Sequence, residues 1–262
     1  MAEKQICKNF FERWTDRSID GIVTIICWVW FIFGFLLFFS WLYLAAALFS
    51  KDPEIRFQQL NSQFYRIFFK IVKLTCPSHT IHIEEKVSPI QSAVIVCNHL
   101  SYLDPLLLIA LFPKQKTIVK SRFFSMPVFG KIIAKSGYLP DKGNGRFTKM
   151  MIEQMEAMGS YLQAGGNLFV FPEGTRSRDG RFGTLNKGAL KIARICKAPI
   201  YVLQLHNTNK LFPPGKFFFK TRVQNTIRME LIDCIQPDYI NNQPTVTELE
   251  QRVRQAYSLR QL

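Results

Sequence analysis

The chain has 262 residues, enough for one globular domain of ordinary to large size plus an appendage, and a second full domain is not expected. It carries 34 lysines and arginines against 19 aspartates and glutamates, a formal charge of +15, so we expect a negatively charged partner: nucleic acid, an anionic membrane surface or a phosphorylated substrate. The six cysteines are far apart and form no Cys-x-x-Cys pair, which argues against a zinc site and a disulfide framework and favours a reducing compartment.

An uncharged run, GIVTIICWVWFIFGFLLFFSWLYLAAALF, extends from Gly21 to Phe49. As a straight helix it would measure about 43 Å, which exceeds the roughly 30 Å of a bilayer core, and it is too long for the apolar part of a signal peptide. Basic residues flank it on both sides, so the positive-inside rule selects no orientation. Two membrane arrangements remain open: one tilted spanning helix, or two short helices broken near Gly34 to Ser40 that dip into one leaflet. The second is favoured because it keeps both basic flanks on the cytoplasmic side, and a buried helix of a soluble protein is the remaining alternative.

The next segment, EIRFQQLNSQFYRIFFKIVKL, has apolar residues at steps of three or four, namely Phe57, Leu60, Phe64, Phe68, Ile71 and Leu74. This pattern predicts an amphipathic helix. We interpret it as an interfacial helix at the level of the lipid headgroups, with a core-facing helix of the following domain as the open alternative. We therefore expect a membrane anchor and interfacial helix over residues 1–75.

From about residue 80, short β-rich runs alternate with helical stretches. The candidate strands are TIHI, AVIVC, TIVK, GYLP, NLFVF, PIYVLQL and IRMEL. The candidate helices span residues 105–112, 123–136, 147–163, 186–196 and 247–259. The last begins with Thr247 followed three residues later by Glu250, as in a capping box. This alternation predicts an α/β domain over residues 76–262, with a mixed, largely parallel sheet flanked by helices.

Two segments carry candidate chemistry, and the first is NHLSYLD, residues 98–104. It places His99 and Asp104 five positions apart, directly after the candidate strand AVIVC. A histidine and an aspartate at this spacing are compatible with a catalytic pair. They are equally compatible with a buried histidine near a turn aspartate, because chance readily supplies such a spacing.

The second segment is VFPEGTRSRDGRF, residues 170–182, which begins within the candidate strand NLFVF and continues into the loop that follows it. Loops at strand ends are where α/β folds place their ligand sites. Pro172 and Gly174 shape the turn, while Arg176 and Arg178 offer fork-shaped donors suited to a phosphate. A solvated basic turn is the alternative interpretation.

Taken together and in this order, NHLSYLD and FPEGTRS resemble the two main motifs of the glycerolipid acyltransferase family, to which 1-acylglycerol-3-phosphate acyltransferases belong. The resemblance covers roughly residues 90 to 205. It implies that the first motif is the catalytic centre and that the second lies at the phosphate of the acceptor. Two further blocks match less well: KSRFFSMPVFGKIIAKSGYLPDK carries over Lys120, Pro127 and Gly130, and KAPIYVLQL keeps Pro199.

The resemblance assigns roles to the site residues. His99 is the expected general base and Asp104 its orienting carboxylate, and the acceptor's own hydroxyl is the nucleophile. The expected phosphate-binding residues are Glu173, Gly174, Thr175, Arg176 and Lys120. Glu173 could instead orient the acceptor or pair with a nearby arginine. Residues with weaker support are Asn98, expected to shape the loop, Lys142, which stands where the family usually has arginine, and Arg146 and Arg178. No metal ligands are expected, and His79, His82, His206 and Cys97 are interpreted as structural.

The leading hypothesis is a membrane-bound enzyme, with its catalytic domain on the cytoplasmic face, that transfers an acyl group to 1-acyl-sn-glycerol-3-phosphate and gives phosphatidic acid. The acyl donor is expected to be acyl-coenzyme A or acyl carrier protein, and no cofactor is expected. A related hypothesis changes the acceptor to another lysolipid, such as a lyso-ornithine lipid. A third, from a different class, is a non-catalytic basic protein bound to a membrane. Nucleic acid is not expected as a partner, because no nucleic-acid-binding motif is evident.

Overall fold

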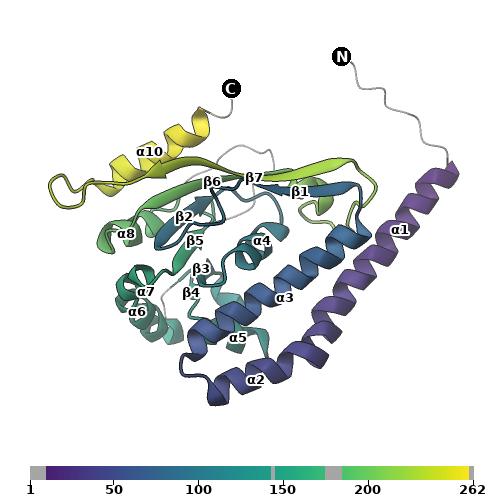
Figure 1. Ribbon diagram of the computed structural model, residues 1–262, viewed down its shortest axis with the longest axis horizontal. Coiled ribbons are helices and arrows are strands. Elements are labelled where there is room, and N and C mark those ends of the chain that lie inside the picture. The colour runs from purple at the N-terminus through teal and green to yellow at the C-terminus, as the bar shows by residue number, and fades with distance from the viewer. Residues whose placement is uncertain (1–9, 143–144, 175–184, 260–262) are drawn as a thin grey trace.

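The computed structural model describes residues 10–142, 145–174 and 185–259. Within these residues seven strands form one sheet in the order β1-β7-β6-β2-β5-β3-β4 (Figure 1). Neighbouring strands are parallel except β6 and β7, which are antiparallel, so the predicted mixed, largely parallel sheet is confirmed. The strands are β1 (His79–Ile83), β2 (Ala93–Cys97), β3 (Gln115–Val119), β4 (Leu139–Pro140), β5 (Asn167–Val170), β6 (Ile200–His206) and β7 (Asn225–Ile235).

The helices begin with an N-terminal group that precedes the sheet and continue between the strands (Figure 1). The N-terminal group is α1 (Phe10–Val29), the π-helix η1 (Trp30–Phe39), α2 (Ser40–Phe49) and α3 (Pro53–Thr75). The others are α4 (Leu103–Leu111), the 3-10 helix η2 (Ser121–Ser125), α5 (Phe129–Lys135), the 3-10 helix η3 (Gly145–Phe147), α6 (Thr148–Glu156), α7 (Met158–Gln163), α8 (Gly188–Ile195), α9 (Thr208–Leu211) and α10 (Val246–Ser258).

Strand β2 lies in the middle of the sheet, and all five of its residues are buried. Because successive side chains of a strand point to opposite faces, the run AVIVC serves two cores at once. Ile95 and Cys97 pack into one core with α3 and α4. Val94 and Val96 pack into a second core with α7, α8 and α10. A continuous apolar strand covered on both faces therefore leads directly into NHLSYLD.

The apolar N-terminal run is helical throughout, and its path bends between α1 and α2 (Figure 1). The two helices predicted to meet near Gly34 to Ser40 are observed as α1 and α2, but the π-helix η1 joins them, so the chain stays helical where a break was predicted. The choice between a spanning and a re-entrant arrangement stays a prediction. A Cβ on Gly34 would lie 2.6 Å from Cε3 of Trp30, so only glycine lets the indole ring rest against the helix.

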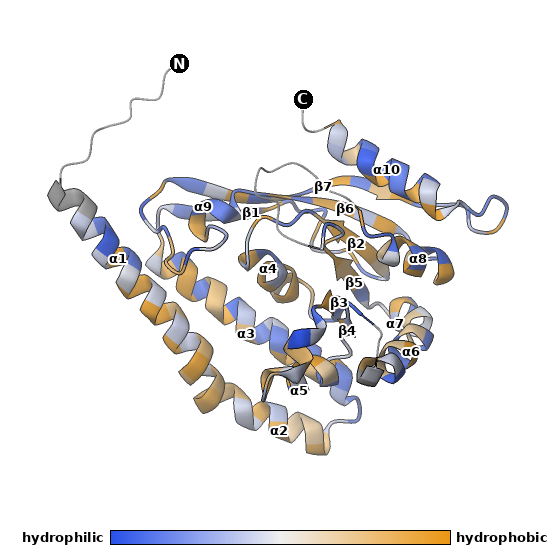
Figure 2. Cartoon of the chain, turned by 180° about the vertical axis from the view of Figure 1, so that it is seen from behind, coloured by the Kyte–Doolittle hydropathy of each residue, from blue (hydrophilic) through white to orange (hydrophobic). Residues whose placement is uncertain are grey.

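Trp14–Phe49 is the one helical stretch in the described part of the chain that is long and apolar enough to cross a membrane. Only 28% of its most apolar window is buried, and apolar residues dominate α1 beyond its first turns and α2 (Figure 2). The side chains of Trp41, Leu48 and Phe49 are among those that are largely exposed. Such exposure does not fit the alternative of a buried helix in a soluble core.

Helix α3 packs its apolar stripe against protein, which corrects the interpretation of residues 54–74 as an interfacial helix. Phe57, Leu60 and Phe64 are buried in a cluster with α2 and η1, while Phe68 belongs to the core beneath α4. Leu74, at the end of the stripe, is exposed. The core-facing alternative is therefore right for most of the helix. The sequence could not decide between the two, because a protein surface and a lipid surface both require the same periodic apolar pattern. The predicted boundary between residues 75 and 76 stays a prediction.

Two of the predicted helices are interrupted in the structure. The predicted helix over residues 123–136 is observed as η2 and α5, because proline disfavours a helical conformation in the residue before it and Met126 is extended (ψ 135°). The predicted helix over residues 147–163 is divided into α6 and α7 at Ala157. Gly130 lies so close to η2 that a Cβ there would collide with the carbonyl oxygen of Phe124.

The predicted capping box is of the right type but was placed two residues too late. The hydroxyl of Thr245 accepts the backbone N–H of Glu248 at 3.2 Å, and the carboxylate of Glu248 accepts the N–H of Thr245 at 2.7 Å. Glu250 instead forms ion pairs with Lys187 and Arg254. The same four-residue spacing starts at both threonines, and the sequence alone did not distinguish them.

A buried lysine in β3 ties α3 to the sheet. The ammonium of Lys116, whose side chain is 1% exposed, lies 2.7 Å from Oε1 of Glu54 and donates a 2.6 Å hydrogen bond to Oε1 of Gln154. It also lies 4.3 Å from the ring centroid of Tyr161. A carboxylate, an amide oxygen and an aromatic face together compensate for the desolvation of this charge.

Replacing Glu54 by alanine is expected to lower the free energy of unfolding by about 2 kcal/mol, because it leaves a buried ammonium without its carboxylate. The expected loss is smaller than the loss for a fully buried ion pair, because the side chain of Glu54 remains 31% exposed. The variant Lys116→Met, which removes the charge itself, should be less destabilising, and adding Glu54→Ala to it should change little. Denaturant titration in detergent measures all three. If Glu54→Ala and Lys116→Met lowered the free energy of unfolding equally, and if the loss in the double variant were the sum of the two, the pairing of Glu54 with Lys116 would be contradicted.

Candidate active site

The predicted site residues follow four neighbouring strands at one edge of the sheet. NHLSYLD follows β2, FPEG follows β5, Lys120 follows β3 and Lys142 follows β4 by two residues. Because these strands are parallel, their carboxyl ends meet at the same edge, which is where α/β folds bind ligands. With a strand spacing of about 4.8 Å, the loop after β5 adjoins the loop after β2, and Lys120 and Lys142 come from strands about 10 and 14 Å from β2.

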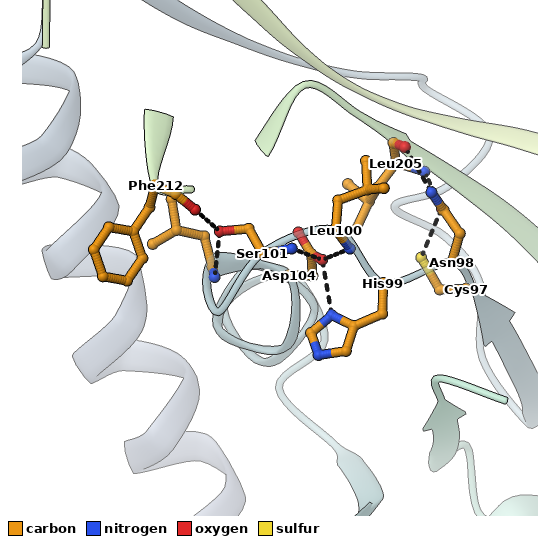
Figure 3. Close-up of polar contacts among 9 residues, drawn as sticks. Cys97, Asn98, His99, Leu100, Ser101, Asp104, Leu205 and Phe212 are labelled. Atoms are coloured by element: carbon orange, nitrogen blue, oxygen red, sulfur yellow. Dashed lines mark hydrogen bonds and ion pairs between the residues drawn. The ribbon is translucent and has the colours of Figure 1, made fainter. Parts of the chain in front are cut away.

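The carboxylate of Asp104 gathers three contacts on a single oxygen (Figure 3). Oδ2 accepts the backbone N–H groups of Leu100 at 2.6 Å and Ser101 at 2.7 Å, and it lies 2.9 Å from Nδ1 of His99. Asp104 is fully buried in the first turn of α4, where the helix dipole favours a negative charge. Three donors and the dipole compensate for this burial, and they hold the loop from residue 99 to residue 101 around the carboxylate.

This geometry fixes which nitrogen of His99 is available. A carboxylate accepts hydrogen bonds, so Nδ1 carries the proton that is directed at Asp104, and Nε2 presents its lone pair. Nε2 points away from Asp104 (Figure 3), and the His99 side chain is 16% exposed. The ring of Phe171 stacks on the imidazole at a centroid distance of 4.3 Å and an interplanar angle of 26°. His99 can therefore accept a proton from a group in the space beside Nε2.

Asn98 connects the start of the loop to β6 through two hydrogen bonds. Its side-chain N–H donates to the carbonyl oxygen of Leu205 at 2.9 Å, and its Oδ1 accepts the N–H of Leu205 at 2.6 Å (Figure 3). The side chain thus replaces one step of the ladder between β2 and β6. These contacts fit the predicted loop-shaping role of Asn98.

Replacing Asn98 by alanine is expected to lower the free energy of unfolding by about 2 kcal/mol, because a backbone N–H and a carbonyl of Leu205 lose their partners. Asn209→Ala, at an exposed position of α9, is the matched control and should cost less than about 0.5 kcal/mol. Thermal unfolding followed by circular dichroism provides the comparison. Equal stability of the two variants would contradict a structural role for Asn98.

Ser101 connects the loop to a segment that the sequence did not implicate. Its hydroxyl donates to the carbonyl oxygen of Phe212 at 2.8 Å and accepts the N–H of Leu103 at 3.3 Å (Figure 3). Ser101 is fully buried, so within the described residues its hydroxyl is satisfied by these two contacts. Of the contacts around His99, those of Phe171, Leu205 and Phe212 were missed. Phe171 could have been found as the last residue of NLFVF and Leu205 as the last residue of PIYVLQL, but Phe212 lies in no candidate strand or motif.

The second motif is described only in part. Gly174 adopts a left-handed conformation (φ 64°), which favours glycine, and its N–H donates to the carbonyl of Phe171 at 3.0 Å. Glu173 lies close to Cys97 and Tyr257. Burial is the main cause that raises the pKa of these two side chains, and the charge of Glu173 is a lesser cause. Thr175, Arg176 and Arg178 lie outside the described residues, so the two roles suggested for Glu173 both stay predictions.

The loops that carry Lys120, after β3, and Lys142, after β4, are joined by hydrogen bonds. The hydroxyl and the N–H of Ser121 both donate to Asp141, at 2.7 and 2.8 Å, which joins the two loops. Burial raises the pKa of Asp141, but these bonds and the charges of Lys142 and Lys120 outweigh it and lower the pKa overall. Lys120 and Lys142 are exposed, and the side chain of Arg146 lies outside the described residues.

The remaining titratable groups near the motifs have structural partners. Burial, with Asp104 and Glu173 as lesser causes, raises the pKa of the Cys97 thiol well above its usual value, so it does not provide a thiolate nucleophile. His79 contacts the carbonyl of Lys220 at 2.7 Å and the amide of Asn225 at 3.1 Å, and burial lowers its pKa. Within the described ranges, no group of three or more histidine, cysteine, aspartate or glutamate residues is arranged to hold a metal ion.

Comparison with known proteins gives a consistent result. Residues 78–205 match the model of the family described as Acyltransferase. The chain is 35% identical over 122 residues to the chloroplastic 1-acyl-sn-glycerol-3-phosphate acyltransferase BAT2 of Brassica napus, a match that covers 47% of this chain and 35% of the relative. It is 28% identical over 168 residues to the 1-acyl-sn-glycerol-3-phosphate acyltransferase of Helicobacter pylori, covering 63% and 68%. The chain thus matches about a third of the length of the chloroplastic relatives.

Among solved structures, the crystal structure of the 1-acyl-sn-glycerophosphate (LPA) acyltransferase PlsC from Thermotoga maritima superposes with a TM-score of 0.66. The match covers 92% of this chain and 93% of that one at 17% sequence identity. It extends well beyond residues 78–205, so the shared architecture includes helices on the N-terminal side of the sheet. The likeness supports the fold.

Proposed function

The chain belongs to the acyltransferase family, and from this premise we propose that it transfers a fatty acyl group from a thioester to the free hydroxyl of 1-acyl-sn-glycerol-3-phosphate, giving phosphatidic acid. The observation that carries the proposal is the 2.9 Å contact between Nδ1 of His99 and the buried Oδ2 of Asp104. It leaves Nε2 as a proton acceptor beside the loop of the second motif. The names of the curated relatives supply the acceptor.

In the proposed reaction, Nε2 of His99 takes the proton of the acceptor hydroxyl as the oxygen attacks the thioester carbonyl. The tetrahedral intermediate collapses with cleavage of the carbon–sulfur bond, and the imidazolium returns its proton to the leaving thiolate. The ester and the free thiol are the products, so atoms and charges balance without a further reactant. Asp104 stabilises the imidazolium while it exists, as the carboxylate does in a Ser-His-Asp triad.

We further propose that the acceptor phosphate binds the loop after β5, with Arg176 as its main partner and Lys120 in support. Glu173, Gly174 and Thr175 shape this loop, and Lys142, Arg146 and Arg178 add positive charge around it. Binding the phosphate at a fixed place holds the hydroxyl near Nε2, and such positioning lowers the barrier to reaction. A lysine contributes charge but lacks the bidentate fork of arginine, so Arg176 is the stronger candidate.

The donor in this proposal is acyl-coenzyme A or acyl carrier protein, both of which are acidic and are attracted by the surplus of basic residues. No cofactor is needed, because the acceptor supplies the nucleophile and the thioester supplies the leaving group. The exposed apolar surface of α1, η1 and α2 supports membrane association. We propose that both basic flanks of this anchor and the catalytic domain lie on the cytoplasmic side.

An acceptor panel tests the proposed substrate. Purified enzyme with a single acyl thioester should acylate 1-acyl-sn-glycerol-3-phosphate at least about 100-fold more efficiently than 1-acylglycerol, which has the same hydroxyl but no phosphate, because charge-assisted bonds to the phosphate are lost. A lyso-ornithine lipid serves as the third acceptor. Mass spectrometry of the products measures each rate. Preference for the ornithine lipid, or equal use of 1-acylglycerol, would overturn the proposed acceptor but not the acyl transfer itself.

A further inference from the structure

The segment that runs from the end of α9 toward β7 combines aromatic and basic residues. We refer to residues 210–222, KLFPPGKFFFKTR, as the aromatic-basic segment. It has four lysines and arginines, four phenylalanines and no acidic residue. None of its residues belongs to a motif that the proposed reaction uses.

The aromatic-basic segment runs antiparallel along one stripe of α1. The N–H and hydroxyl of Thr221 donate to Oδ1 of Asp20 at 2.8 and 2.7 Å, and Thr221 is buried. The other contacts follow α1 one helical turn at a time. Before Asp20, Arg222 pairs with Asp16 at 3.4 Å. After it, the N–H of Phe219 donates to the hydroxyl of Thr24 at 3.0 Å, and the ring of Phe217 stacks on Trp28 at 5.8 Å. The segment therefore fixes the rotation of α1 against the domain.

The opposite end of the segment reaches the candidate active site. The carbonyl of Phe212 accepts the hydroxyl of Ser101, and the Phe212 ring lies 6.1 Å from the ring of Tyr102. Phe212 also stacks on Phe219 at 4.6 Å. One short stretch of chain thus joins the apolar N-terminal helix to the loop that carries His99.

Residues 216–220, where the segment contacts the second half of α1, form a tip that is partly exposed to solvent. Phe217 is 58% exposed and Phe218 is 55% exposed, and the side chains of Lys216 and Lys220 beside them are exposed as well. Through Trp28, itself 44% exposed, the tip is continuous with the exposed apolar surface of α1. That surface consists of Ile22, Ile25, Ile26 and Val29 of α1 and continues into η1 with Ile32 and Phe33.

We propose that residues 216–220 form a second membrane-contact site, whose partner is the surface of a bilayer that contains anionic lipid. Phe217 and Phe218 enter the interfacial layer, and Lys216 and Lys220 contact lipid phosphates. An anionic bilayer is the proposed partner because these residues continue the exposed apolar surface of α1 and because the segment carries only basic charges. The inference rests on the proposed membrane association of α1 and α2. With two contacts instead of one, the His99 loop is held at a fixed height and orientation above the lipid that supplies its acceptor.

The direct test is quenching by lipid-borne nitroxide groups in the full chain, reconstituted in vesicles of phosphatidylcholine and phosphatidylglycerol. Single cysteines carrying a fluorophore replace Phe218, Leu37 on η1, or Ile240, in a background in which Cys7, Cys196 and Cys234 are serine. Ile240 is 85% exposed and belongs to the loop between β7 and α10. This loop lies on the other side of the molecule from α1 (Figure 1). We expect strong quenching at positions 218 and 37 and little at position 240.

Quenching at position 37 without quenching at position 218 would overturn the second contact and leave the anchor intact. No quenching at either position would overturn both the membrane association and this inference. The readout needs no turnover, so loss of the proposed acyl transfer is recognised separately.

A pair of aspartate variants gives an independent readout. Phe218→Asp should reduce acyl transfer to a lysolipid embedded in vesicles by about fivefold or more, because it places a charge in the interfacial layer. Transfer to a short-chain lysolipid dissolved below its critical micelle concentration should be unchanged. The matched control Ile240→Asp should leave both rates unchanged. An equal loss of both rates in Phe218→Asp would show a purely structural role for the segment and overturn the proposal.

Discussion

Replacing His99 by alanine is expected to reduce kcat for acyl transfer by about 10³-fold or more, because the reaction loses the group that takes the proton from the acceptor hydroxyl. The fold should persist, since the imidazole makes one hydrogen bond and one ring stack and is not part of either main core. Initial rates at saturating acceptor and donor, together with the melting temperature, measure the two effects.

His82→Ala is the matched control for this variant. It makes the same chemical change at an exposed position of β1 and should keep full activity. Turnover within a few fold of the wild-type rate in His99→Ala would refute the assignment of His99 as the base.

Replacing Asp104 by asparagine is expected to reduce kcat by about 100-fold, less than the loss of His99 itself. The N–H groups of Leu100 and Ser101 need an acceptor where Oδ2 now lies, so the amide oxygen takes that position and still accepts from Nδ1 of His99. The amide nitrogen then replaces Oδ1, which is buried and has no hydrogen-bond partner among the described residues. The tautomer is kept, and what is lost is the negative charge that stabilises the imidazolium.

Asp104→Ala separates charge from geometry. It removes the acceptor of both backbone N–H groups and frees the imidazole, so activity should fall at least about tenfold below that of Asp104→Asn. The free energy of unfolding should fall by about 2 to 3 kcal/mol through the unsatisfied donors. Steady-state kinetics and denaturant titration of the two variants provide the comparison. Equal activity of the asparagine and alanine variants would mean that Asp104 does not position the ring.

The sequence predicted the sheet and the placement of the first motif because those features depend on local pattern. AVIVC is apolar at every position, as a strand buried on both faces must be, and the loop that follows it carries His99 to the edge of the sheet. The His99–Asp104 contact itself required folded coordinates, since five positions in a chain do not by themselves bring two side chains to 2.9 Å.

Other features depend on what an element packs against, which a periodic pattern does not specify. Helix α3 has the apolar stripe of an interfacial helix, yet Leu60 and Phe68 are completely buried in protein. The helix predicted over residues 123–136 is broken because Pro127 outweighs the apolar spacing around it. The partners of the His99 loop, Leu205 and Phe212, lie more than 100 positions away in the chain, and no local signal connects them.

Transfer of an isotopically labelled acyl group is the most direct test of the central claim. The purified full chain is mixed with a labelled acyl thioester and 1-acyl-sn-glycerol-3-phosphate, and the products are identified by mass spectrometry. We expect labelled phosphatidic acid and one equivalent of free thiol from the wild-type protein, and only background from the His99→Ala variant. Wild-type protein that forms no labelled phosphatidic acid, or a variant that forms as much as the wild type, would contradict the proposed function of this site.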